Sequence, residues 1–466
     1  MPYADALVFS HPEQIARLSA SCAEAVPSAV LAGDPCFDRI LAALPYRERF
    51  RRALGVRPAQ RLVVLNSTWN PTSLFGDAGA EDVFPLLLRR CAAELPLDEF
   101  RLAAVLHPNI AAGHGQGQLR MWLDGARRAG LALVDPLRDW RQALIAADLV
   151  VGDFGSVTYY GAALGKPVLL GAVDPEALDP GSPVAAFTRA APRLDVHAPV
   201  LPQIEESLRT HRPLAWTADL ATSAPGGSAE LLRALFYRLI GVPEPDGPAL
   251  LDPLPLPAYD PAAPTAPVRV TTTVRPDGSV ELRRLPLSAG RPDADDGTGG
   301  HGGTGAEDGR VATHLAVHED TLDPGALEIA DLIWRQGDPG DPRLGPPHRW
   351  AAETLDRHPG CALAVFVTGP GTCVTRDRTG LLAELTVAGA DPAAGASAGL
   401  ALGQPPPATF HVRLGDRVQR VRSRLLDGRG APGALGETPL PQVVQVPQMD
   451  DGVLRTQGDC GAVGEP

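Results

Sequence analysis

The chain has 466 residues, long enough for two or three domains, and its 55 acidic and 42 basic residues give a formal net charge of -13. Non-specific binding to nucleic acid or to an anionic membrane needs a basic face, so this charge argues against both, and we expect no nucleic-acid partner. The 6 scattered cysteines form no CxxC pair, and no run reaches the ~18 apolar residues of a membrane span. We therefore expect a cytoplasmic protein, at most peripheral to a membrane, without a zinc or disulfide framework.

Residues 1–57 contain two short apolar runs, DALVFS and SAVLAGDP, which predict strands. Each run is followed by a helical pattern, PEQIARLSASC and CFDRILAALPYRERFRRALGV. One or two βα units are too few for a separate domain. We therefore interpret residues 1–57 as a remnant of a crossover or N-terminal region that packs on the domain after it.

Residues 58–244 alternate apolar runs with amphipathic segments, which is the pattern of parallel βαβ units. The predicted strands are RLVVLNST, RLAAVLHPN, LALVDP, LVVGD and PVLLGAVD. Runs such as Val63–Leu65 contain no polar residue, as expected for strands covered on both faces. The helix SAELLRALFYRLIGV ends the pattern at Gly241 and Pro243. The predicted fold class is α/β, with a Rossmann-like parallel sheet.

Stretches rich in Pro and Gly divide the rest of the chain. Residues 245–266 form a Pro-rich linker, and residues 267–286 predict a β-hairpin around a Pro-Asp-Gly turn. Residues 287–310 and the tail 429–466 have the low-complexity composition of disordered segments. Between them, residues 311–428 mix strands with the predicted helix PGALEIADLIWRQ, which indicates a small α+β domain.

Polar or small residues follow four of the predicted strands, and none of these ends presents Leu or Val. In an open parallel sheet, ligands bind beyond the carboxyl ends of the strands. The sequence therefore predicts a ligand site formed by these strand ends. The candidate residues are Ser67 and Thr68 after the first strand, His107 after the second, Asp153, Gly155, Ser156 and Thr158 after the fourth, and Asp174 and Glu176 after the fifth.

The Gly-Asp-Phe-Gly-Ser turn at residues 152–156 joins a strand directly to a helix. Its two glycines let the backbone approach a ligand closely, and free N–H groups at a helix start favour a phosphate or pyrophosphate. The hydroxyls of Ser156 and Thr158 would add donors. The alternative is that Ser156 is only an N-cap and Gly155 only a turn residue.

His107 ends the second strand in the sequence His-Pro-Asn. We expect Pro108 to force an extended exit and to deny further helix, which would hold the imidazole at the edge of the sheet to meet a phosphate. A structural histidine with satisfied hydrogen bonds is the alternative.

His314 and His318 have the spacing of paired metal ligands on a helix. The alternation of Val311, Thr313 and Leu315 instead predicts a strand, with both histidines on its polar face. HExxH and the Walker loop are absent, and the GxGxxG and GxSxG patterns occur only in the Gly-rich stretches 297–305, 395–399 and 428–433, away from the predicted βαβ units, so we expect no metal and no cofactor.

The stretch ADLVVGDFGSVTYYGAALGKPVLL resembles the C-terminal half of GT-B glycosyltransferase-like proteins, most closely the CDP-glycerol glycerophosphotransferase family. That family has an apolar strand, Asp-Tyr-Ser-Ser-Val, a short helix, and Arg/Lys-Pro-Ile/Val-Leu. Residues 153–157 and 166–169 fall on those positions without a gap. The segments VLAGDPCFDRIL, LGVRPAQRLVVLNSTW and AVLHPN agree in order with other parts of the family pattern.

The resemblance implies a domain that binds a CDP- or UDP-linked donor, within a glycosyl- or glycerophosphotransferase for a cell-envelope polymer. Ser156 and the helix N-terminus would hold the pyrophosphate, His107 would contact phosphate as the catalytic candidate, and Asp174 and Glu176 would lie near the ribose. Gly155 departs from the family, because it replaces the first Ser of the pair and removes one hydroxyl.

The resemblance covers about residues 5–240 and begins near the end of the family's N-terminal domain. That domain carries the acceptor site and the catalytic base, so a partner or an upstream extension would have to supply it.

Two other functions stay open. UDP-N-acetylglucosamine 2-epimerases share the Gly-Lys-Pro-Val-Leu ending, but they place acidic residues where this chain has Thr158, Tyr159 and Tyr160. The other is a non-catalytic nucleotide-sugar-binding or scaffold protein, in which residues 311–428 contact a partner.

Overall fold

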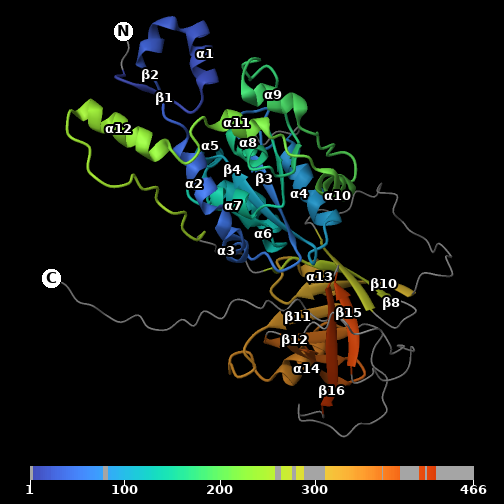
Figure 1. Cartoon of the computed structure of the whole chain (residues 1–466). Helices are drawn as coiled ribbons and strands as arrows, with labels where there is room; N and C mark the ends of the chain where they lie inside the picture. Colours follow the sequence, from blue (N-terminus) through green and yellow to red (C-terminus); the bar gives the residue numbers. More distant parts are fainter. Residues whose placement is uncertain are drawn as a thin grey trace. The chain divides into compact units, whose positions relative to one another are not determined.

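The structure is a computed structural model that describes most of the chain in two compact units. The described residues are 4–76, 82–257, 264–274, 280–287, 310–369, 371–388, 409–414 and 417–426. The first unit comprises residues 1–264 and 285–291, and the second comprises residues 265–284 and 292–466 (Figure 1). None of the helices in the described part of the chain has the length and hydropathy that crossing a bilayer requires.

The first unit is built on a five-stranded parallel sheet, which confirms the predicted α/β class. Its strands are β3 (Arg61–Ser67), β4 (Phe100–Leu106), β5 (Ala132–Leu133), β6 (Leu149–Gly152) and β7 (Val168–Leu170). The strand order is β5-β4-β3-β6-β7. The chain therefore adds β4 and β5 on one side of β3, and then returns to add β6 and β7 on the other side of β3. The direction of winding reverses between β3 and β6, which is the topological switch point of the sheet.

Helices cover both faces of this sheet (Figure 1). Along β3, Leu62 and Val64 pack into one apolar cluster, whereas Val63 and Leu65 pack into the other. This two-sided burial explains why the strands read as uninterrupted apolar runs. The helices are α1 (Pro12–Ser21), α2 (Pro35–Ala43), α3 (Arg47–Ala53), α4 (Val83–Glu94), α5 (Pro108–His114), α6 (Gln116–Arg128), α7 (Trp140–Ala146), α8 (Ser156–Ala163), α9 (Pro183–Ala190), α10 (Val200–Thr210), α11 (Trp216–Ala221) and α12 (Ser228–Ile240).

The N-terminal region packs on the same core. β1 (Leu7–Phe9) pairs in parallel with β2 (Ala29–Leu31), and Phe37 on α2 and Phe50 on α3 are buried in the cluster on one face of the sheet. The carboxylate of Asp38 on α2 accepts hydrogen bonds from the N–H groups of Gly226 and Ser228 at 2.7 and 3.0 Å. These bonds tie the start of α12 to α2. The last turn of α12 stops at Gly241, whose φ of 72° is left-handed, as the sequence predicts for the end of this helix.

The second unit contains a mixed sheet that curls and closes on itself, with two helices, α13 (Pro324–Glu328) and α14 (Pro347–Arg357). Its strand order is β10-β11-β12-β13-β14-β16-β15-β9-β8, and β8 pairs back to β10. The strands are β8 (Val268–Val274), β9 (Val280–Pro286), β10 (Arg310–His318), β11 (Leu332–Gln336), β12 (Leu363–Gly369), β13 (Thr372–Asp377), β14 (Leu382–Ala388), β15 (Thr409–Leu414) and β16 (Arg417–Leu426). The two strands of the predicted hairpin are thus members of this larger sheet.

The predicted helix PGALEIADLIWRQ is only partly correct. α13 ends at Glu328, and Leu332–Gln336 forms β11, which pairs in parallel with both β10 and β12. A short apolar run such as Leu-Ile-Trp fits a helix or a strand equally well by pattern, so pairing with two distant strands decides the outcome. The segments 287–310 and 429–466, where we predict disorder, lie outside the described residues except for residues 287 and 310.

Candidate functional site

The switch point lies at the carboxyl ends of the strands, where the sequence predicts the ligand site; we call this end of the sheet the ligand edge. The loop after β3 and the loop after β6 leave neighbouring strands there, and the loops after β4 and β7 flank them. Open α/β sheets bind ligands in the crevice at this place, because the two loops diverge from each other.

Asp153 lies at the centre of the switch point and is fully buried. Its carboxylate accepts hydrogen bonds from the N–H groups of Thr68, Leu74 and Gly155 at 2.8, 3.0 and 3.0 Å, and from the Ser67 hydroxyl at 3.2 Å. Burial raises the pKa of Asp153, while these donors act in the opposite direction. Asp153 therefore positions the loops that follow β3 and β6. Ser67 is also buried, so its hydroxyl serves Asp153 rather than a ligand.

Thr158 faces inward as well. It has no exposed surface, and its hydroxyl oxygen accepts a hydrogen bond from Asn66 at 2.9 Å. A Cβ atom added at Gly152 would lie 2.3 Å from that oxygen, so only glycine permits α8 to approach β6 this closely. The hydroxyl of Thr158, predicted as a ligand donor, is thus used inside the protein.

The first turn of α8 is the part of the turn that stays open. Gly155 is the N-cap residue, and no side chain caps the helix. Ser156 is the first helical residue, so its predicted alternative role as an N-cap is wrong. The N–H groups of residues 156–158 have no hydrogen-bond partner among the described residues. Ser156 is exposed, and Gly155 is packed so closely against Thr68 that an added Cβ would lie 3.1 Å from the Cβ of Thr68.

His107 lies after β4, but the expectation that Pro108 denies a helix is wrong. Pro108 is the first residue of α5, where its missing N–H costs nothing, and His107 is the N-cap. The Nδ1 atom of His107 accepts a hydrogen bond from the N–H of Asn109 at 3.2 Å. In the neutral ring the proton is then on Nε2, so the imidazole can donate a hydrogen bond to a ligand.

Burial lowers the pKa of His107, and the nearby Asp153 carboxylate acts in the opposite direction. The ring lies 6.1 Å from the indole of Trp69, measured between centroids. Trp69 follows β3 and is 55% exposed. Our sequence reasoning did not select Trp69 as a site residue, although its place in the Asn-Ser-Thr-Trp strand end is the signal that marks it.

Asp174 and Glu176 follow β7 at the other end of the edge. Asp174 accepts a hydrogen bond from the Thr72 hydroxyl at 2.9 Å, which joins the β7 loop to the β3 loop. The second oxygen of Asp174 accepts the N–H of Glu176 at 2.9 Å. Glu176 itself is exposed, so its carboxylate is open to a ligand.

The histidine pair predicted as the weaker metal alternative lies on strand β10, in the second unit. His318 packs edge-on against Trp334 with ring centroids 4.5 Å apart, and its side chain is only 14% exposed, so the face that we predicted to be polar is partly covered. Within the described ranges, no group of three or more His, Cys, Asp or Glu side chains is placed to hold a metal ion.

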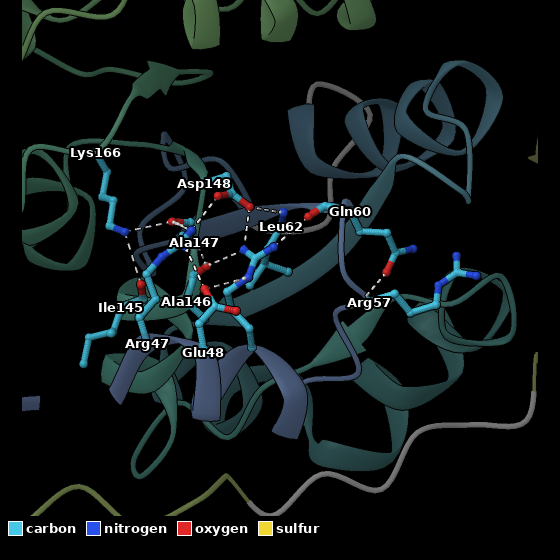
Figure 2. A network of polar contacts seen from close by, with 11 residues as sticks. Arg47, Glu48, Arg57, Gln60, Leu62, Ile145, Ala146, Ala147, Asp148 and Lys166 are labelled. Atoms are coloured by element: carbon cyan, nitrogen blue, oxygen red, sulfur yellow. Dashed lines mark hydrogen bonds and ion pairs between the residues drawn. The ribbon is translucent and has the colours of Figure 1, made fainter. Parts of the chain in front are cut away.

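Lys166, which matches the basic residue of the family pattern, precedes β7 and belongs to a polar network at the amino ends of the strands. Figure 2 shows this network. The Nζ atom of Lys166 donates to the backbone carbonyls of Ile145 and Ala147 at 3.1 and 2.9 Å. Burial lowers the pKa of Lys166 to about 8. Beside it, the Asp148 carboxylate accepts hydrogen bonds from Arg47, from Arg51 and from the N–H of Leu62. This network fastens the amino ends of β3 and β6 and is remote from the ligand edge.

Comparison with protein-family models found no match, and neither did comparison with curated proteins. Among solved structures, the chain is similar to the wall teichoic acid polymerase TagF, with 14% identity over 51% of this chain and 58% of that chain and a TM-score of 0.33. It is also similar to a glycosyltransferase from Rickettsia africae ESF-5, with 11% identity, 51% and 64% coverage and a TM-score of 0.30. A third similar structure is the UDP-GlcNAc 2-epimerase from Neisseria meningitidis bound to UDP-GlcNAc, with 13% identity, 51% and 61% coverage and a TM-score of 0.32.

The chain spans less than two thirds of the length of each of these three structures. They show a distant similarity to GT-B-type proteins over half of the chain. The more specific resemblance to the CDP-glycerol glycerophosphotransferase family stays a prediction from the motifs.

Proposed function

We propose that the first unit binds a nucleotide-diphosphate-linked donor at the switch point and serves a glycosyl- or glycerophosphotransferase reaction. The observation that supports this most directly is the open first turn of α8. Its uncapped N–H groups lie at the switch point of the sheet, which is the place where open α/β sheets bind ligands.

The spacing of the strand ends suits an elongated donor. Neighbouring strands lie about 4.8 Å apart, so the ends of β4 and β7, three strands apart, are separated by roughly 14 Å. His107 stands at one end of this line and Asp174 and Glu176 at the other, with the N-terminus of α8 between them. A diphosphate would lie over α8, and the exposed carboxylate of Glu176 would accept hydrogen bonds from the hydroxyl groups of a ribose or a sugar.

The chemistry at the switch point is that of an anion held by neutral donors. The N–H groups of residues 156–158 and the positive end of the helix dipole would meet the phosphate oxygens. His107 would add its Nε2–H, and in a transfer reaction it would stabilise the leaving phosphate as a donor or general acid.

A non-catalytic donor-binding module is the second candidate, and one observation favours it. In its neutral form His107 already uses Nδ1 as an acceptor, and Asp153 is buried under four donors. Neither group is therefore placed to act as the base, which a partner chain with an acceptor domain would have to supply. The epimerase alternative stays a prediction that these contacts do not test; the hydroxyls of Tyr159 and Tyr160 donate to Thr217 and Asp34 inside the protein.

Titration calorimetry of the full chain with CDP, UDP and CMP tests the donor site. We expect the two diphosphates to bind more tightly than CMP, and His107→Ala to weaken the diphosphates more than CMP. Equal affinities for all three nucleotides, unchanged in His107→Ala, would remove the assignment. Release of CMP from CDP-glycerol, or of UDP from a UDP-sugar, then separates a transferase from a binding module.

A further inference from the structure

A cavity of about 490 Å³ lies at the edge of the parallel sheet beside β7, between α8, α9 and α10. Its floor is apolar and consists of buried side chains, among them Ala162, Val168, Leu169 and Phe187. The volume is within the range of roughly 300–1,000 Å³ that is typical of sites for small molecules. The floor would therefore accept the apolar body of a small ligand.

Two exposed basic residues, Arg193 and Arg212, are among those that line this cavity, and their exposure places them on its solvent side, which we call the entrance. Arg193 donates to the backbone carbonyl of Thr188 at 3.0 Å, and Arg212 has no hydrogen-bond or ion-pair partner among the residues that the structure describes. The acidic lining residue, Glu206, already forms an ion pair with Arg209. The charge left at the entrance is positive.

Two further polar groups reach the cavity wall from the segment before β7 and the segment after α10. Lys166 is held by two backbone carbonyls, and His211 makes a 2.9 Å hydrogen bond through Nε2 to the carbonyl of Gly165. These bonds fix the wall without neutralising the arginines. The residues that line the cavity include none from the loops at the switch point, so the cavity is separate from the proposed donor site.

We propose that this cavity is a second binding site, for an amphipathic carboxylate with an aliphatic or aromatic body. The apolar floor between α8 and α9 holds the body, and the guanidinium groups of Arg193 and Arg212 hold the carboxylate at the entrance. This assignment is independent of the donor site. The cavity lies beside the edge strand β7 rather than at the switch point, and it would bind a carboxylate through arginines rather than a phosphate through backbone N–H groups.

The test is calorimetric titration of the full chain with octanoate, 1-octanol and octylamine, which share one apolar chain and differ in the charge of the head group. We expect octanoate to bind most tightly. Arg212→Gln removes a side chain with solvent access and without a partner among the described residues, so it should weaken octanoate by about three- to tenfold and leave 1-octanol unchanged. Arg120→Gln, on the exposed side of α6, removes the same charge away from the cavity and should have no effect.

Ala190→Trp tests the body of the site, because Ala190 is an exposed lining residue at the end of α9 and a larger side chain there would fill the cavity. We expect it to abolish octanoate binding while CDP binding persists, which also shows that the variant is folded. Absence of octanoate binding to the unmodified chain, equal affinity for octanoate and 1-octanol, or full binding by Arg212→Gln would overturn the proposal.

Discussion

Replacing Ser156 with proline tests whether the backbone of α8, rather than the serine hydroxyl, holds the phosphate. Proline has no N–H, and it is well tolerated at the first position of a helix. Gly155 precedes it with ψ of 160°, the extended conformation that a residue before proline prefers. The substitution therefore removes one donor from the open turn with little strain. Ser156→Ala is the matched control, because it removes the hydroxyl and keeps the N–H.

The expected loss follows from the character of the bond. A hydrogen bond to a charged phosphate oxygen contributes about 1.5–3 kcal/mol, and each 1.4 kcal/mol is a factor of ten in affinity. Ser156 is exposed, so solvent screening favours the lower end of this range. We expect Ser156→Pro to weaken CDP or UDP by about tenfold and Ser156→Ala to weaken them by less than threefold.

Calorimetry with the two diphosphates measures the affinities, and thermal unfolding monitored by circular dichroism shows whether each variant is folded. A folded Ser156→Pro variant with wild-type affinity for both diphosphates would refute the reasoning, since the N–H of residue 156 would then contribute nothing. A loss in Ser156→Ala as large as in Ser156→Pro would also contradict it and would assign the contact to the hydroxyl.

Three further predictions concern the supports of the site. Gly152→Ala should lower the free energy of unfolding in urea by about 1–3 kcal/mol, because the added methyl group clashes with Thr158. Gly113→Ala is the control, because Gly113 has open space around it, and it should not destabilise the protein. An unchanged stability of Gly152→Ala would contradict the close approach of α8 to β6. Because burial lowers the pKa of His107, CDP should bind more tightly only at a pH below the usual histidine pKa, where the imidazole becomes cationic. The Kd of His107→Gln should not change over that range, and parallel profiles would show that another group titrates. Between about pH 8 and 10.5 the unfolded chain holds the Lys166 proton more tightly than the folded chain. In urea unfolding, the stability of the wild type should therefore rise with pH relative to that of Lys166→Met. A fall in this difference would show that the pKa of Lys166 is not lowered.

Much of the first unit could be predicted from the sequence because its signals are local. Strands buried on both faces contain no polar residues, and the left-handed Gly241 marks the end of α12. The order of the strands is not a local property. The switch point between β3 and β6 depends on which side of β3 the chain returns to, and no residue pattern encodes that choice.

The sequence predicts which strand ends form the candidate site, but it does not predict which of their side chains are buried and which are exposed. Asp153, Thr158 and Ser156 lie within a single short turn, yet the first two are buried and the third is exposed. That difference comes from partners at the end of another strand, Asn66 on β3 and Thr68 just after it, which approach only after the sheet has formed. β11 shows the same limit in the second unit, because its two strand partners outweigh the helical pattern of its sequence.

The closed sheet of the second unit determines where the gene can be divided. β8 and β9 lie before residue 287, yet they occupy the positions between β15 and β10 that complete the ring of strands. A fragment that starts at residue 311, as the sequence alone would suggest, would leave two neighbouring strands with unpaired backbone edges and a tendency to aggregate. A recombinant fragment for studying this half of the protein should therefore begin near Thr265.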